Sequence, residues 1–162
     1  MHIGASHASC VLALLTAGVM AFAQGSSSDK TSVPAQAAGS NSVKYFSKDD
    51  VAASFAKGGT LVTEADYKVM TAHRTESGNV EIHRSYTDVF YIVQGSTNIV
   101  TGGKVIGEKA TNPDEPRGDS IEGGETRRLA AGDAMIIPAG VPHWMKDVEG
   151  TLLYFVVKVK NP

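Results

Sequence analysis

The stretch GDAMIIPAGVPHWM, residues 132–145, decides how this chain of 162 residues is expected to fold. A glycine turn leads into the apolar run 134–137, and a Pro-Ala-Gly turn then precedes His143. Short apolar runs bounded by glycine and proline are typical of β-strands. The stretch therefore predicts two strands joined by a tight turn, with a histidine on the second strand.

The same pattern continues on both sides of this stretch. Short runs rich in Val, Ile, Tyr and Thr predict strands at residues 60–64, 67–74, 79–84, 88–94, 96–101, 127–129, 134–137, 142–147 and 151–159. One short helix is expected near residues 48–57, because Ser47 is a suitable N-cap and two glycines follow the run. Many short strands with a single short N-terminal helix predict an all-β sandwich or barrel.

The N-terminal part of the chain differs in composition from the rest. Residues 10–23 form an uncharged apolar run that ends in Ala-Phe-Ala, which is typical of a secretory signal peptide and too short to span a bilayer. A membrane anchor is the alternative interpretation. The small, polar residues that follow predict a flexible linker. We therefore expect a signal peptide over 1–23, a linker over 24–42, one domain over 43–162, and a periplasmic or secreted protein that leaves the membrane after cleavage.

The composition excludes several classes of function. The formal net charge of −2 gives no basic patch of the kind that binds nucleic acid. The single cysteine, Cys10, lies in the expected signal peptide, so the mature domain has no disulfide, thiolate ligand or cysteine nucleophile. The sequence also contains no G-x-S-x-G motif and no phosphate-loop or dinucleotide-binding fingerprint.

Residues that suit a metal site lie in the stretch VEIHRSYTDVFYIVQG, residues 80–95. Glu81 and His83 are two residues apart, so on a strand their side chains point to the same face. Asp88 opens the next expected strand, from which the same point is within reach, and His143 would join them only in a folded barrel. Two imidazoles and two carboxylates suit a divalent Mn, Fe, Ni, Zn or Cu ion.

These two stretches resemble the two sequence motifs of the cupin superfamily. The second motif, G-x5-P-x-G-x2-H-x3-N, is matched by Gly132, Pro138, Gly140 and His143, with Asp147 in place of the asparagine. The first motif, G-x5-H-x-H-x3–4-E-x6-G, is matched by His83 and Gly95, with Thr75, Glu81 and Asp88 in place of its first glycine, first histidine and glutamate. The resemblance covers roughly residues 60–159.

The resemblance implies a double-stranded β-helix, or jelly-roll, barrel with a divalent transition metal in its interior, and a homodimer built on apolar strands. The usual cupin site has three histidines and one glutamate, whereas the site here would hold Glu81, His83, Asp88 and His143. Glu81 is either the fourth ligand or a general base beside a two-histidine, one-carboxylate site. A cupin without metal, in which these groups bond to one another, is the third interpretation.

Other residues near the expected pocket are candidates for substrate binding or proton transfer. Arg74 and Arg84 suit a substrate carboxylate, and His73 lies on a neighbouring expected strand. Tyr86, in the turn between the ligands, is a candidate proton donor. Ion pairing of the arginines, structural hydrogen bonding of the histidine and core packing of the tyrosine are the alternatives.

The function expected from these residues is an exported metal-dependent enzyme that acts on a small polar or carboxylated molecule in the barrel mouth. The resemblance implies oxygenase, isomerase or lyase chemistry without choosing among them. A non-catalytic module that binds or senses a metabolite or metal ion is the alternative, and a barrel with a packed interior is the third. The long polar segment 101–127 is expected to be a functional or mobile loop.

Overall fold

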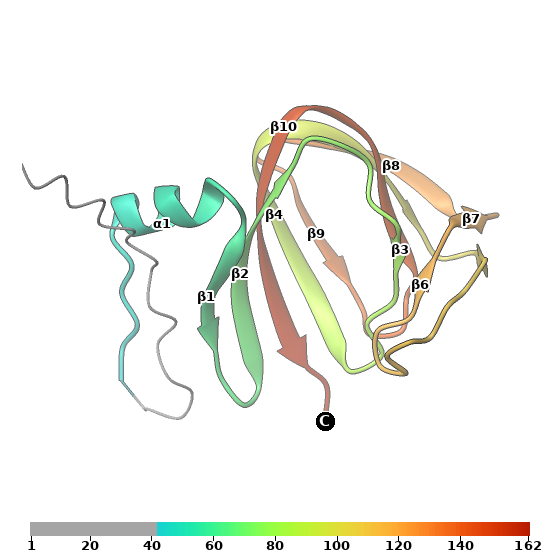
Figure 1. The fold of residues 1–162 in the computed structure, drawn as a ribbon, viewed down its shortest axis with the longest axis horizontal. Coiled ribbons are helices and arrows are strands. Elements are labelled where there is room, and N and C mark those ends of the chain that lie inside the picture. The colour runs from blue at the N-terminus through green and yellow to red at the C-terminus, as the bar shows by residue number, and fades with distance from the viewer. Residues whose placement is uncertain (1–41) are drawn as a thin grey trace, which may run out of the picture. The chain divides into compact units, whose positions relative to one another are not determined.

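The structure is a computed structural model that describes residues 42–162. The expected signal peptide, and all but the last residue of the expected linker, lie outside the described residues. Among those described, no helix is both long and apolar enough to cross a membrane. The described chain forms a jelly-roll barrel of antiparallel strands, with one short helix on its outside (Figure 1). The all-β barrel expected from the sequence is confirmed.

One helix and ten strands follow one another along the described chain. They are α1 (Lys48–Phe55), β1 (Gly59–Thr63), β2 (Tyr67–Arg74), β3 (Val80–Glu81), β4 (Tyr86–Thr101), β5 (Lys104–Ile106), β6 (Arg117–Gly118), β7 (Ser120–Glu122), β8 (Glu125–Ala130), β9 (Ala134–Ile137) and β10 (His143–Lys160). The expected strands 67–74 and 134–137 have these bounds as β2 and β9.

The sequence prediction was wrong for the two longest strands, because it divided each of them into two shorter strands. Residues 88–94 and 96–101 belong to one continuous strand, β4, which bends at Gly95, where φ is 78°. Residues 142–147 and 151–159 likewise belong to β10, whose register shifts near Asp147, where φ is 51°. Glycine and a bulge bend these strands without interrupting their pairing, so a turn signal in the sequence did not mark a strand end.

Because β4 and β10 are long and bent, each contributes to both walls of the barrel. The C-terminal half of β10 and the N-terminal half of β4 pair with each other and lie between β2 and β9, with β1 beyond β2. The other halves of β4 and β10 pair with each other between β8 and β3, with β6 beyond β3. The two sheets enclose one core.

The core lies between the two sheets and consists mainly of alternate residues of β4 and β10. Its buried members are Phe90, Ile92, Ile99, Leu129, Ile137, Met145, Leu152, Tyr154 and Val156. The helix covers part of the outer face, where Phe55 packs edge-to-face on Phe155 with ring centroids 5.0 Å apart. Ser47 caps this helix in a capping box with Asp50, as its place in the sequence predicts.

The polar segment 101–127 is more ordered than the expected loop. It contains β6 and a two-stranded sheet of β5 and β7. The segment is also bonded to the chain beside β3, because the amide of Ile82 donates to Pro116 O at 3.1 Å and that of Arg84 donates to Asp114 O at 2.9 Å. This segment therefore forms a wall beside Glu81 and His83.

Candidate metal centre

The backbone around β3 and β10 brings one carboxylate and two imidazoles together. Glu81 and His143 are direct partners across the β3–β10 ladder, and His83 follows Glu81 by two residues. The carbonyl of His83 accepts a 2.9 Å hydrogen bond from the amide of Gly140, in the turn that precedes β10. Gly140 has a φ of 79°, which glycine adopts without strain. Gly140, which belongs to the second motif, thus helps to hold His83, which belongs to the first motif.

Glu81, His83 and His143 form a group whose ligand atoms all lie within 4.8 Å of one another. The Nε2 atom of His83 lies 3.3 Å from Oε2 of Glu81, and Nε2 of His143 lies 3.9 Å from the same oxygen. A zinc-like ion with bonds of about 2.1 Å holds its ligand atoms about 3 to 3.4 Å apart. Small shifts would bring these three atoms onto one ion.

The protonation of His143 suits a ligand. Its Nδ1 lies 3.3 Å from the carbonyl of Val141 and donates to it, which leaves Nε2 with a free lone pair. This Nε2 is buried and has no hydrogen-bond partner. Burial lowers the pKa of His143, so the imidazole is neutral at neutral pH. A neutral buried imidazole with an unpartnered nitrogen, facing a carboxylate, fits a transition metal ion.

Glu81 is held as a carboxylate. Burial alone raises its pKa, but the hydrogen bond with His83 and the positive charges of Arg117 and Arg74 outweigh burial and bring the pKa to about 2. The guanidinium of Arg117 contacts Oε1, and that of Arg74 lies 3.4 Å from the same atom. The other oxygen, Oε2, faces the histidines. An anionic oxygen is thus already directed at the point where the imidazoles meet.

Asp88 has a different set of neighbours from the other three predicted ligands. Its Oδ2 lies 3.5 Å from Nε2 of His83 and 3.9 Å from Nε2 of His143, so it reaches the same group. Both of its oxygens, however, also accept 2.9 Å hydrogen bonds from Nζ of Lys158, its partner across the β4–β10 ladder. The ammonium neutralises Asp88 and fixes it in place. The structure therefore offers three side chains that face one another, and a fourth whose two oxygens are both bonded to a lysine.

The residues predicted to bind substrate are divided between the site and the surface. Arg74 lies at the site, where its Nε donates to the hydroxyl of Tyr154 at 2.9 Å. Arg84 is on the surface and donates to Pro113 O. His73 is bonded through Nδ1 to Phe55 O at the end of α1, on the face of β2 opposite to Arg74.

Tyr86 lies two residues before Asp88 on β4, and its ring is 5.1 Å from Nζ of Lys68. Its side chain is therefore on the same face of the strand as Asp88, at the end of β4 that leads into the barrel. Tyr86 is not among the three grouped ligands, and its role as a proton donor stays a prediction.

The free space beside the three ligands is small. A cavity of about 10 Å³ is lined by Arg74, Asn79, Glu81, Phe90, His143, Met145 and Tyr154. A cavity needs about 10–15 Å³ to hold one water molecule. The site as it stands therefore accommodates a water-sized ligand, and a larger one requires side chains to move.

Four side chains that contact the predicted ligands or Arg74 were not predicted from the sequence, namely Glu115, Arg117, Tyr154 and Lys158. Arg117 belongs to the charged PDEPRGD run, which resembles a solvated turn. A signal existed for Lys158, because it follows the inward-facing Tyr154 and Val156 at two-residue spacing in an apolar strand. A lysine at an inward position of such a strand requires a buried anionic partner.

Comparison with known proteins gives one sequence match and several distant structural likenesses. A model of the cupin family matches residues 69–162, which are 94 of the 162 residues. No curated protein matches significantly.

Three solved structures illustrate the likeness in fold, each with a TM-score of 0.47. A Bacillus halodurans protein is 15% identical, with 64% of this chain and 69% of that chain covered. KdgF from Halomonas sp. is 18% identical, covering 65% and 80%. The cupin domain of Schizosaccharomyces pombe Cnp3 is 12% identical, covering 65% and 61%. At these identities the likeness concerns the fold alone.

Proposed function

The chain belongs to the cupin family, and on this basis we propose that it binds a divalent transition metal ion and is a metal-dependent enzyme. Glu81, His83 and His143 would hold the ion. The observation that carries the proposal is the buried Nε2 of His143, which has no hydrogen-bond partner and faces Oε2 of Glu81. Mn, Fe, Zn, Ni and Cu all suit two imidazoles and a carboxylate.

The substrate we propose is a small polar or carboxylated molecule that reaches the open side of the ion. A bound ion would supply Lewis-acid chemistry and, held by three side chains, would keep coordination positions free. Arg74 and Arg117, which flank Glu81, provide positive charge for an anionic group. An oxygenase, an isomerase and a lyase are all compatible with these features.

The charge on Glu81 favours the role of ligand over that of general base. A general base works best when its pKa lies near the working pH. The pKa of Glu81 is about 2, so near pH 7 it accepts a proton only weakly. An ionised carboxylate with a free oxygen is, however, a suitable ligand. Of the two roles left open by the sequence, we therefore propose the first.

A non-catalytic metal-binding or sensing function is the alternative. The cavity beside Glu81 and His143 measures about 10 Å³, which leaves room for water but not for an organic substrate without rearrangement. Asp88 would complete a closed set of four ligands if Lys158 moved away. Around a four-coordinate ion such as Zn²⁺, this closed set has no position for substrate, and this arrangement would favour capture of an ion over turnover.

Elemental analysis tests the metal proposal. The protein is purified without chelator, beside His143→Ala and the matched control His73→Ala, whose imidazole is bonded at α1. We expect close to one equivalent of metal in the wild type and in His73→Ala, and loss of metal from His143→Ala. Wild-type protein without metal, even after incubation with Mn, Fe, Zn, Ni and Cu, would contradict the proposal. Spectroscopy of the bound ion separates the two functions. An ion that carries bound water supports the enzyme, whereas an ion held only by protein ligands supports the alternative.

We also propose export to the periplasm or the medium, with cleavage after residue 23. The apolar run 10–23 and its Ala-Phe-Ala end support this proposal. N-terminal sequencing of protein recovered from cell fractions tests it. A mature protein that begins at Gln24 is the expected result, and an uncleaved chain in the membrane fraction would support the anchor instead.

A further inference from the structure

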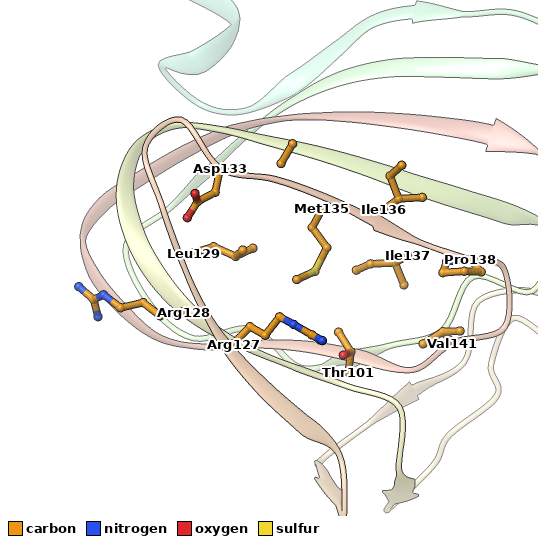
Figure 2. Close-up of a pocket in the computed structure, with 11 residues that line it drawn as sticks. Thr101, Arg127, Arg128, Leu129, Asp133, Met135, Ile136, Ile137, Pro138 and Val141 are labelled. Carbon is orange, nitrogen blue, oxygen red and sulfur yellow. The ribbon is translucent and has the colours of Figure 1, made fainter.

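A second and larger cavity, of about 560 Å³, lies between β8 and β9. Within residues 42–162 each of these strands pairs only with β4, so each forms the edge of its sheet. Figure 2 shows side chains of both strands pointing into the space between the two edges. Glu81, His83, Asp88 and His143 are not among its lining residues, so the cavity is distinct from the candidate metal centre.

The wall of this cavity combines polar and apolar side chains, and its apolar part is formed by the inner faces of the two strands. Met135 and Ile137 are the cross-strand partners of the buried Phe90 and Asp88, and cross-strand partners share a face of the sheet. Leu129 is in the same way the partner of Thr97, which is fully buried. Pro138 and Val141 complete the apolar part of the lining. An apolar molecule would replace water here with a gain in free energy.

One cation points into this cavity. Arg127 pairs with Ile99, whose side chain is fully buried, so Arg127 also belongs to the inner face. Figure 2 shows its guanidinium directed into the cavity near Thr101, while the guanidinium of Arg128 points away. Arg128 is instead bonded to Glu149.

Arg127 contacts Glu125 through one terminal nitrogen. A guanidinium has five N–H donors, so this contact leaves other donors for a ligand. The cavity therefore combines an apolar part with one guanidinium that can donate two parallel hydrogen bonds to an anion. The carboxylate that also lines it, Asp133, accepts a 2.8 Å hydrogen bond from the amide of Ala130.

We propose that this cavity binds a small amphipathic carboxylate. The apolar body of the ligand would lie on Leu129, Met135 and Ile137, and its carboxylate would accept hydrogen bonds from Arg127. The volume falls within the range of about 300–1,000 Å³ that is usual for small-molecule sites. A strand from a second copy of the chain fits less well, because an inward-pointing charge on an edge strand opposes strand addition.

The proposal goes beyond the proposed metal function and does not need a bound ion. Octanoate and 1-octanol are titrated into the full chain in the presence of EDTA. The methyl resonances of Leu129, Met135 and Ile137 report on the cavity. We expect octanoate to shift all three with saturation, and 1-octanol, which has the same chain without the charge, to bind about tenfold more weakly.

Two neighbouring arginines provide a matched pair of variants. Arg127→Gln is expected to weaken octanoate binding about tenfold, which corresponds to about 1.4 kcal/mol, while Arg128→Gln keeps the wild-type affinity. Absence of methyl shifts up to the solubility limit overturns the proposal, and so does an equal loss of affinity in both variants. Shifts of these methyl groups with protein concentration alone also overturn it, since they would show a second copy in the cavity. Because the titration is made in EDTA, its failure would leave the metal proposal intact, and that proposal is tested separately by the metal content.

Discussion

At the scale of single residues, the candidate centre is defined by which cation neutralises which carboxylate. Glu81 contacts two arginines through Oε1, while its Oε2 faces the histidines and lies 3.3 Å from Nε2 of His83. Asp88 has both oxygens bonded to one lysine. Because a carboxylate must give up its other partners to bind an ion, Glu81 is ready to bind and Asp88 is not. Lys158 therefore determines whether the centre has three ligands or four.

Replacing Lys158 with Met is expected to have two opposite effects. Without metal, Asp88 is left buried and unpaired, and the free energy of unfolding should fall by about 3 kcal/mol. With metal, the freed Asp88 becomes a ligand, so the affinity for Zn²⁺ should rise about tenfold. Denaturant unfolding with and without Zn²⁺, together with calorimetric titration, measures both effects. Lys160→Met, on the exposed end of the same strand, is the control. A folded variant with unchanged or weaker affinity contradicts this account of Lys158.

The ion pair of Arg128 and Glu149, which lies outside the candidate centre, makes the stability of the protein depend on pH. Arg128 bonds to both oxygens of Glu149, and Ser96 donates to one of them, so the pKa of Glu149 falls from 4.5 to about 2, chiefly through Arg128. A lowered folded-state pKa adds stability that is fully present above the unfolded pKa and is lost as pH falls towards the folded pKa.

We therefore expect Glu149→Gln to be less stable than the wild type above about pH 4.5 and to approach it between pH 4.5 and 2. Urea unfolding of both proteins at pH 7, 4.5 and 3 gives the difference. The effect is small, because exposed ion pairs contribute little. In an Arg128→Gln background the pH dependence of the difference should shrink. A difference that grows as the pH falls would have the wrong sign for this mechanism.

At the scale of elements, the barrel depends on the bend that lets β4 join both sheets. The bend occurs at Gly95, where φ is 78°, a value that other residues adopt at a cost. A Cβ added there would lie 2.5 Å from the carbonyl oxygen of Thr151 on β10, so the glycine is also needed for the close approach of the two strands.

Gly95→Ala is accordingly expected to destabilise the protein more than Gly132→Ala. At Gly132 φ is also positive, 95°, but a Cβ would meet no atom within 4 Å. The Gly132 variant should therefore lose only the conformational term of about 1–2 kcal/mol, and the Gly95 variant that term plus the clash. Thermal and urea unfolding of both variants provide the comparison. Equal losses would show that β10 moves aside without cost.

At the scale of the whole molecule, local patterns predicted the fold class and three members of the centre. Glu81 and His83 were predicted from two-residue spacing on an expected strand 79–84, and His143 from the spacing of turn residues around Pro138. These are short-range features of the sequence.

The bounds of β2 and β9 were also predicted from short-range features, because turn residues flank each strand. The prediction of strand 79–84 was too long, because β3 ends at Glu81 and His83 lies in the segment that follows it. The helix α1 begins where it was predicted to begin but ends at Phe55, before the expected residue 57.

The partners of these residues depend on register between strands, which the sequence does not reveal locally. Lys158 meets Asp88 because β4 and β10 pair over their whole length, across 70 positions of the chain. Arg117 meets Glu81 because β6 pairs with β3, inside a segment that was expected to be a loop. The pairing of strands that are distant in the sequence thus decides which cation contacts each predicted carboxylate ligand.

The outer face of one sheet bears on the oligomeric state of the whole molecule. Tyr91 and Val93 on β4 alternate with buried residues and therefore point outward, as does Ile136 on β9. They are 50%, 42% and 68% exposed. Exposed apolar side chains gathered on one face mark an interaction site, and a face without charge can pair with its own copy about a two-fold axis.

Ile136→Lys should therefore convert the homodimer expected for this protein into a monomer, because each copy would bring a charge into the apolar contact. Sedimentation equilibrium of the full chain measures the mass. Tyr45→Lys serves as the control, since Tyr45 is 80% exposed but precedes α1 and lies outside this face. Wild-type protein that sediments as a monomer contradicts the homodimer itself. A variant that remains dimeric, as Tyr45→Lys is expected to do, would show that the dimer contact does not include this face.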